Sequence, residues 1–138
     1  MRTLGIDYGD SRAGLAISDA LGITAQGLET VHHNGNDKVL LKRLEEVINE
    51  YKIDCIVVGK PLNMNGTATE RVEVTEKFIH KLKCKFNNIK IETIDERLTT
   101  VQAQRTMIDL NINGKKKKNL VDTISAVYIL ETYMNRKK

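Results

Sequence analysis

The stretch Leu4-Gly5-Ile6-Asp7-Tyr8-Gly9 opens the chain and decides how its fold is read. Residues 2–8 predict a β-strand that ends close to Asp7, because apolar side chains lead up to one acidic residue. A carboxylate at the end of such a strand lies at the sheet edge where open α/β folds bind ligands. Gly9 permits close approach of a phosphate or a metal ion to the backbone. Asp7 is therefore a candidate ligand, although a turn aspartate that accepts backbone N–H bonds would look the same.

Two further strands are expected directly after the first, at residues 13–19 and, more weakly, at 26–32. The short loop 8–12 suggests that the first two strands form an antiparallel hairpin. Residues 54–58 are a continuous apolar run of strand length, which is typical of a central parallel strand buried on both faces. Residues 89–94 alternate between apolar and polar side chains and predict the last strand.

Helices are expected between and after these strands, at residues 37–51, 67–84, 99–110 and 119–134. The first of them carries apolar residues at helical spacing, with Asn36 or Asp37 as its cap. A meander of three strands followed by alternating helices and strands predicts antiparallel and then parallel pairing. The expected fold class is α/β: a mixed five-stranded sheet flanked by helices, in a single domain of residues 1–138.

The composition is that of an ordinary globular chain, with 41% hydrophobic and 29% charged residues. No apolar run approaches the ~20 residues that span a bilayer, and the first residues show no secretory signal; we expect a cytoplasmic protein. Cys55 and Cys84 are too few and too far apart for a metal knuckle. The net charge of +4 includes consecutive lysines at 115–118 and basic residues at 136–138. These clusters favour a polyanion partner, or are simply solvated.

A second acidic group, Asp95-Glu96-Arg97, follows the last expected strand. If that strand neighbours the first, Glu96 can face Asp7 at the sheet edge, and one of the acids would bind a metal ion. Arg97 would neutralise a phosphate or fix a carboxylate. Asp95 and Thr99 are explained more simply as caps of the following helix, an explanation that does not cover Glu96.

Asp122 is the third acidic candidate, near the start of the final helix. Helical spacing puts it on one face with Ser125, Ala126 and Ile129, and that face is small and otherwise uncharged. An acid on such a face is costly unless a cation or a donor pairs with it. An N-cap or a first-turn acid favoured by the helix dipole is an equally good explanation. Lys118 lies four residues earlier and points to the same side if the helix begins that early.

Three carboxylates from separate elements suit a Mg²⁺ or Mn²⁺ site, because such hard cations prefer oxygen ligands. Two of these ions about 4 Å apart can activate water and stabilise the leaving oxygen of a phosphodiester. The histidines offer no comparable set. His32, His33 and His80 lack ligand spacing, and we expect all three at the surface.

The polar loop from Gly59 to Gly66 follows the buried strand and lies on the same expected sheet edge. Lys60 and Asn63, together with backbone N–H groups, could bind a sugar-phosphate backbone there. The loop lacks the Gly-Lys-Ser/Thr ending of a phosphate-binding P-loop. A plain connection would need no such role, and the sequence leaves both interpretations open.

Taken in order along the chain, these segments resemble the YqgF family, also called RuvX. Each motif alone is weakly specific, and the ordered set is highly specific. The resemblance extends from end to end and rests on Leu4–Gly9 with Arg12, Gly14 and Ala16, on Val58–Gly66, on Asp95–Thr100 with Ala103, and on Lys118 with Asp122, Ser125, Ala126, Ile129 and Leu130. The chain departs from the family pattern at Lys60, where Leu or Phe is frequent, and at Ser125, where Ala is usual.

The resemblance implies an RNase H-like fold and a carboxylate site, which maps onto Asp7, Glu96 and Asp122 as catalytic and metal-binding residues. The expected cofactor is Mg²⁺ or Mn²⁺ at a two-metal site. The residues expected to bind nucleic acid are Arg12, Lys60, Asn63, Arg97 and Lys118. The resemblance also implies trimming of the 5′ end of pre-16S rRNA in ribosome biogenesis, with pre-16S rRNA or pre-ribosomal particles as partners. We expect no membrane contact, and a monomer or a weak homodimer.

Three other functions compete with this one. A Holliday junction resolvase acting on DNA shares the fold and the acids, so the site alone does not separate it from an RNA-processing nuclease. A sugar kinase or actin-like ATPase also begins with a strand and Asp-x-Gly, but it needs two domains around a cleft, and 138 residues leave no room for them. A non-catalytic ribosome-assembly factor that binds RNA would need the basic surface and not the acids. A saturable Mn²⁺ site that is lost in Asp7→Asn would exclude this last class.

Overall fold

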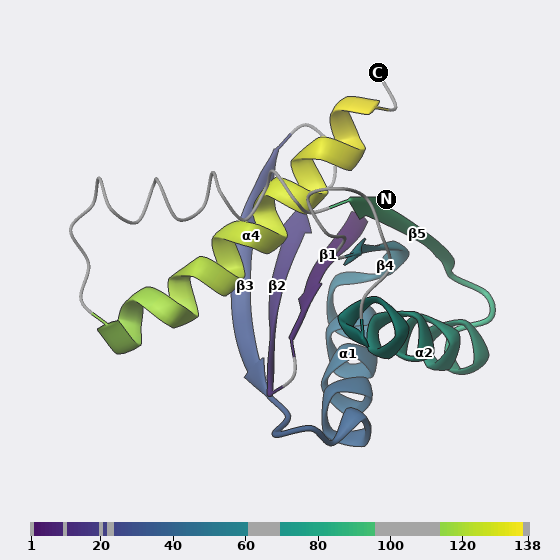
Figure 1. Ribbon diagram of the computed structural model, residues 1–138. Helices are drawn as coiled ribbons and strands as arrows, with labels where there is room; N and C mark the ends of the chain where they lie inside the picture. Colours follow the sequence, from purple (N-terminus) through teal and green to yellow (C-terminus); the bar gives the residue numbers. More distant parts are fainter. Residues whose placement is uncertain are drawn as a thin grey trace.

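In a computed structural model of the chain, five strands form one sheet in the order β3-β2-β1-β4-β5 (Figure 1). The strands are β1 (Arg2–Tyr8), β2 (Arg12–Ser18), β3 (Ala25–His32), β4 (Ile53–Lys60) and β5 (Lys90–Asp95). β2 pairs antiparallel with both β1 and β3, whereas β4 pairs parallel with both β1 and β5. The expected α/β fold with a mixed five-stranded sheet is confirmed.

The structure describes residues 2–9, 11–19, 21, 24–60, 70–95 and 114–136, without the side chains of residues 70–72, 95, 114–122 and 136. Within these ranges the helices are α1 (Asp37–Tyr51), α2 (Glu70–Lys85) and α4 (Gly114–Arg136). None of them is long and apolar enough to cross a membrane. The helix expected at residues 99–110 lies outside the described residues.

Helices α1 and α2 cover one face of the sheet, and α4 runs obliquely across the other (Figure 1). α1 begins as predicted, with Asn36 as its N-cap, whose side-chain oxygen accepts a hydrogen bond of 3.1 Å from the Lys38 N–H. α4 begins at Gly114 rather than at residue 119. It therefore includes the lysines at 115–118, which are good helix formers.

The alternation of side chains along β1 divides them between two cores. Leu4, Ile6 and Tyr8 are buried in the larger core, which α1 and α2 close. Gly5 faces α4 instead, because a Cβ at Gly5 would stand 2.9 Å from the carbonyl oxygen of Ala126. Asp7 comes two residues after Gly5 and therefore lies on the α4 face as well.

Strand β4 is buried on both faces, as its continuous apolar run predicted. Ile56 and Val58 belong to the core under α1 and α2, while Cys55 and Val57 pack in the smaller core under α4. The parallel strands β1, β4 and β5 therefore lie at the centre and one side of the sheet with helices on both faces. This arrangement fixes the edge at which their carboxyl ends meet.

Candidate active site

Asp7 lies near the C-terminal end of β1 and is partly buried. The three parallel strands are in register at its level, since Ile6 pairs with Val58 and Val58 pairs with Thr93. Asp7 and Ile94 each come one residue later on their strands. Ile94 is buried in the core under α4, so both positions belong to the α4 face of the same sheet edge.

Strand β5 ends at Asp95, and Glu96 and Arg97 lie outside the described residues. Ile94 precedes Glu96 by two residues in the sequence and lies on the α4 face. β4 alone separates β5 from β1, which puts the two strands roughly 10 Å apart. The structure thus brings the end of β5, up to Asp95, to the edge where Asp7 lies.

Asp122 lies in α4 one helical turn before Ser125 and Ala126. Its own side chain is outside the described part of the structure, but Ser125 and Ala126 are fully buried on the sheet-facing side of α4. Ala126 packs over Gly5, only two residues before Asp7 in the strand. Helix α4 therefore crosses β1 next to the candidate edge, with the position of Asp122 one turn earlier on that same helix face.

Ser125 carries a buried hydroxyl, and its Oγ has no hydrogen-bond partner within the described part of the chain. Ser125 lies one turn before Ile129, which packs with Val57 and Ile94, so the hydroxyl faces the β4 side of the sheet. A buried polar atom without a partner costs about 1–3 kcal/mol. Asp7 on β1 and Ser125 and the Asp122 position on α4 carry carboxyl and hydroxyl oxygens, which are the kind of ligand that a hydrated divalent cation prefers.

Among the side chains that the structure describes, no three His, Cys, Asp or Glu residues gather as metal ligands. Glu96 and the side chain of Asp122 fall outside that set. The convergence of Asp7, Glu96 and Asp122 at one metal site therefore stays a prediction.

Arg12 is a basic residue at the start of β2, the strand that pairs with β1 at Asp7. Asp7 pairs with Gly14 across the β1–β2 ladder, and Arg12 comes two residues before Gly14. Alternation puts Arg12 on the α4 face, diagonal to Asp7. Lys118 lies in α4 one turn before Asp122, with its side chain outside the description, and Asn63 and Arg97 are not described at all.

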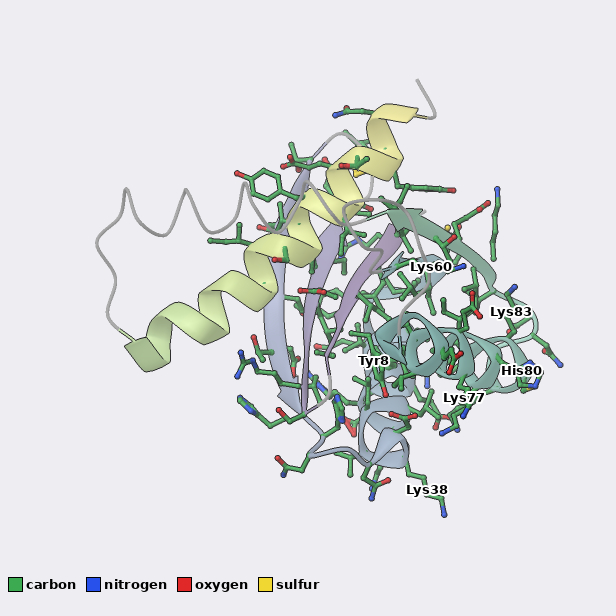
Figure 2. All side chains as sticks on the ribbon, viewed as in Figure 1. Tyr8, Lys38, Lys60, Lys77, His80 and Lys83 are labelled. Atoms are coloured by element: carbon green, nitrogen blue, oxygen red, sulfur yellow. The ribbon has the colours of Figure 1, made fainter. Side chains whose placement is uncertain are left out.

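Lys60 does not lie beside Asp7, although it ends β4 at the same sheet edge. It follows Val58 by two residues and shares the opposite face, where its Nζ is 2.8 Å from Oε1 of Glu76 in α2. Figure 2 shows Lys60 beside α2. Strand alternation thus directs the Lys60 side chain away from α4 and toward α2. Its role in nucleic-acid binding stays a prediction.

Sequence reasoning placed His33 at the surface, and this was wrong. His33 is only 2% exposed. Its Nε2 lies 2.9 Å from the carbonyl oxygen of Gly9, in the turn directly after β1, and its Nδ1 lies 3.1 Å from the amide N–H of Gly35. The partner at Gly9 is 24 residues away in the sequence, so no local pattern reveals that this histidine is satisfied in the interior.

A hollow of about 490 Å³ lies on α2, lined by Glu73, Glu76, Lys77, His80 and Lys81. Figure 2 shows Lys77 and His80 on the outer side of this helix. The lining mixes both signs of charge, and the helix covers the sheet face opposite to Asp7. The hollow therefore lies on the face away from Asp7, and its described lining includes none of the residues predicted to bind metal or nucleic acid.

The described fold is similar throughout its length to solved resolvases. The fowlpox virus resolvase, crystallised with substrate Holliday junction DNA, superposes with a TM-score of 0.64 at 15% identity, covering 99% of each chain. RuvC of T. thermophilus, in complex with a Holliday junction substrate, gives a TM-score of 0.56 at 15% identity and covers 99% of this chain and 96% of its own. These likenesses define the class of fold as RNase H-like.

The sequence comparison narrows the class to a family. The family model for RuvX, described as Holliday junction resolvase, matches residues 1–136. A relative from Ruminiclostridium cellulolyticum, named "Putative pre-16S rRNA nuclease", is 56% identical over 138 residues, which cover 99% of this chain and 95% of the relative. The chain belongs to the RuvX family of nucleases, as the order of its motifs indicated.

Proposed function

We propose that the protein is a divalent-metal-dependent nuclease that hydrolyses phosphodiester bonds in structured nucleic acid. The observation that carries the proposal is the position of Asp7 at the end of β1 on the α4 face, two residues beyond the point where α4 packs on Gly5. A carboxylate at the carboxyl end of a central parallel strand is where open α/β sheets bind ligands. Residues 1–138 would act together as one nuclease domain.

In this proposal Asp7, Glu96 and Asp122 hold the cation with carboxylate oxygens from β1, from the chain after β5 and from α4. Bound Mg²⁺ or Mn²⁺ supplies charge that stabilises the attacking and leaving oxygens of a phosphodiester. Arg12 lies diagonal to Asp7 on the same face and would pair with a neighbouring phosphate. Ser125 Oγ would donate a hydrogen bond to a water molecule or a phosphate oxygen at that site.

The substrate that we propose is the 5′ end of pre-16S rRNA, free or within pre-ribosomal particles, and the protein would act in the cytoplasm. The name of the relative from R. cellulolyticum supports this choice, and the net charge of +4 is compatible with a polyanion. One cut in one strand needs a single active site, so a monomer or a weak homodimer would suffice. We propose no membrane partner.

Resolution of a four-way DNA junction is the second candidate, favoured by the description of the family model and by the likeness to two resolvases. A junction has two-fold symmetry, so its resolution takes two related cuts and favours a symmetric dimer. The oligomeric state on the substrate therefore separates the two candidates independently of activity.

The test is cleavage of end-labelled pre-16S rRNA fragments and of a labelled four-way DNA junction, side by side, in Mg²⁺ and in Mn²⁺. We expect cuts near the mature 5′ end of the RNA that are absent in Asp7→Asn, and an intact junction. Symmetric cuts in the junction together with an intact RNA would establish the resolvase instead. If the protein binds the RNA and cuts neither substrate, a non-catalytic assembly factor is the correct function.

A further inference from the structure

The end of β1 that carries Asp7 extends beyond the pairing of β1 with β4. Among the described residues, the pairing of β1 with its parallel neighbour β4 ends at Ile6 and Val58, whereas the pairing with β2 continues to Tyr8 and Ala13. Within the sheet, Asp7 and Tyr8 are therefore paired with β2 and not with β4. A carboxylate that binds a metal must be held to within roughly 0.5 Å, so the contacts that fix residues 7–9 bear directly on its geometry.

The Tyr8 side chain gives that support from the opposite face of the sheet. Tyr8 is 5% exposed and stacks on Phe78 of α2, with ring centroids 4.2 Å apart and planes inclined by 8°. Its hydroxyl donates a hydrogen bond of 2.6 Å to Oδ1 of Asp37, the first residue of α1. Lys81 of α2 donates to the other oxygen of Asp37 at 2.9 Å. The residue next to Asp7 is thus fixed to both helices that cover that face (Figure 2).

His33 fixes the turn that follows Tyr8. Its ring also stacks on Tyr8, with centroids 5.5 Å apart and planes inclined by 1°. The Gly9 carbonyl can only accept, so the His33 Nε2 carries the proton and donates to it, while Nδ1 accepts from the Gly35 N–H. The backbone N–H of His33 also donates to the carbonyl of Ser11 at 3.0 Å. One buried residue therefore holds the turn at Gly9 and at Ser11.

The turn leaves no room for a side chain at Gly9. A Cβ there would stand 2.7 Å from the carbonyl oxygen of Arg12, which already accepts a hydrogen bond of 2.9 Å from the Gly9 N–H. The chain direction on both sides of the turn is therefore set by close backbone contacts. Any displacement of His33 passes directly to Gly9, two residues from Asp7.

We propose that Tyr8 and His33 are positioning residues for the Asp7 carboxylate, acting from the opposite face of the sheet through the backbone of residues 7–9. This inference rests on the proposed metal site at Asp7. Neither side chain reaches that site, since both belong to the α1 and α2 face. Their contribution is to hold the end of β1 where β4 no longer pairs with it, so that the carboxylate is already oriented before the cation binds.

Four variants of the full chain test this role. His33→Leu removes both ring hydrogen bonds, His33→Gln keeps the donation to Gly9 because its Nε2 reaches a similar position, and Tyr8→Phe keeps the stacking but loses the bond to Asp37. Leu82→Ala is the control, because Leu82 of α2 is fully buried in the same core. The readouts are the Mn²⁺ dissociation constant, the amide hydrogen exchange of Gly9 in metal-free protein, and the melting temperature.

We expect His33→Leu to weaken Mn²⁺ binding by about 10- to 100-fold, as is usual when an outer-shell partner of a ligand is lost, and to speed Gly9 exchange by roughly tenfold or more. His33→Gln should restore most of the Mn²⁺ affinity and of the slow Gly9 exchange. Tyr8→Phe should give values between those of wild type and His33→Leu. Leu82→Ala should lower the melting temperature and leave the Mn²⁺ dissociation constant within about twofold of wild type.

Three outcomes would contradict the proposal, and they can be told apart. If Asp7→Asn abolishes Mn²⁺ binding but His33→Leu and Tyr8→Phe bind Mn²⁺ as wild type does, the positioning role is wrong and the metal site stands. If Mn²⁺ binding is indifferent to Asp7→Asn, the proposed metal site is wrong, and the positioning role falls with it. If Leu82→Ala weakens Mn²⁺ binding as much as His33→Leu does, general loss of stability explains the effect and the positioning role is again overturned.

Discussion

The carbonyl oxygen of Ala126 in α4 lies 2.9 Å from the point where a Cβ on Gly5 of β1 would stand. Helix and strand are therefore in backbone contact just before Asp7, and only glycine permits that contact. The Cβ of Leu130 would be 3.0 Å away on the same side. This close packing is what sets the distance between the end of β1 and the face of α4 that carries Asp122.

Gly5→Ala should displace α4 and lower the free energy of unfolding by about 1–3 kcal/mol, because the neighbouring atom is backbone and has little freedom to move. Mn²⁺ affinity should fall with it, since Asp7 and Asp122 move apart. Gly27→Ala is the matched control on β3, where the Cβ would meet a Thr123 side chain at 3.3 Å and a small adjustment suffices. Urea denaturation and Mn²⁺ titration of both variants measure the difference. Equal losses of stability and of Mn²⁺ affinity in the two variants would show that the contact at Gly5 does not position α4 for the site.

Ser125→Ala should leave the metal-free protein as stable as wild type or more stable by about 1 kcal/mol, because it removes a buried hydroxyl that has no partner in the described chain. If that hydroxyl serves the site, the same variant should bind Mn²⁺ or substrate more weakly. Thr132→Ala is the control, an exposed hydroxyl of α4 that donates to the Tyr128 carbonyl at 2.7 Å. A Ser125→Ala protein with a clearly lower melting temperature would show that the hydroxyl has a structural partner.

The stability of the protein should fall in acid partly through Asp37. Burial alone would raise the pKa of Asp37, but hydrogen bonds from Tyr8 and Lys81 outweigh it and hold the pKa below 3.8. A carboxyl with a lowered folded-state pKa stabilises the fold above its unfolded pKa, and that stability is lost as the pH falls through the folded pKa. The stability gap between wild type and Asp37→Asn should therefore be constant near neutrality and shrink below about pH 4.

Urea midpoints at several pH values between about 2.5 and 7 check the Asp37 prediction. Glu50→Gln, at an exposed acid of the same helix, serves as the control for the loss of one negative charge. A gap between wild type and Asp37→Asn that persists unchanged at the lowest pH would mean that the Tyr8–Asp37–Lys81 contacts do not stabilise the fold through the charge on Asp37.

Removal of one phosphate-binding cation should lower the salt dependence of nucleic-acid binding by about one unit of slope. We expect this of Lys118→Ala, because Lys118 lies one turn before Asp122 in α4. Lys60→Ala should change the slope less, since Lys60 is paired with Glu76 on the other face. Lys42→Ala, on an exposed position of α1, should leave the slope unchanged. A slope that depends on Lys60 and not on Lys118 would place the nucleic acid on the α2 side.

Much of the fold could be predicted because its signals are local. The strand at residues 2–8 was expected from apolar residues leading to Asp7, and helix 37–51 from helical spacing with a capping asparagine at 36; both are observed with these bounds. The final helix was expected too late, at residue 119, because lysines and a glycine give no apolar periodicity. The sheet order follows from the mixed pairing, which the succession of strands and helices predicts.

The candidate site could be predicted from the sequence only in part. The place of Asp7 near a strand end could be predicted from the sequence, since apolar residues lead up to this one acid. The face of the sheet to which each side chain points could not be predicted in the same way. Lys60 and Asp7 end neighbouring strands, and only the strand register shows that they point to opposite faces of the sheet. The buried His33 depends on a carbonyl at Gly9 that chain folding brings to it, and no spacing of residue types could have predicted that contact.

Single-turnover cleavage by Asp7→Asn is the most direct test of the account. In Mn²⁺ the variant should lose cleavage by orders of magnitude, because a ligand of the cation is gone. It should also melt no lower than wild type and bind nucleic acid in EDTA at least as well, because like-charged carboxylates repel one another when no cation is present. Asp54→Asn, an exposed acid in β4, should cut normally. A stable Asp7→Asn protein that cuts at the wild-type rate would place the chemistry elsewhere, and one that melts well below wild type would show that Asp7 is a structural turn residue.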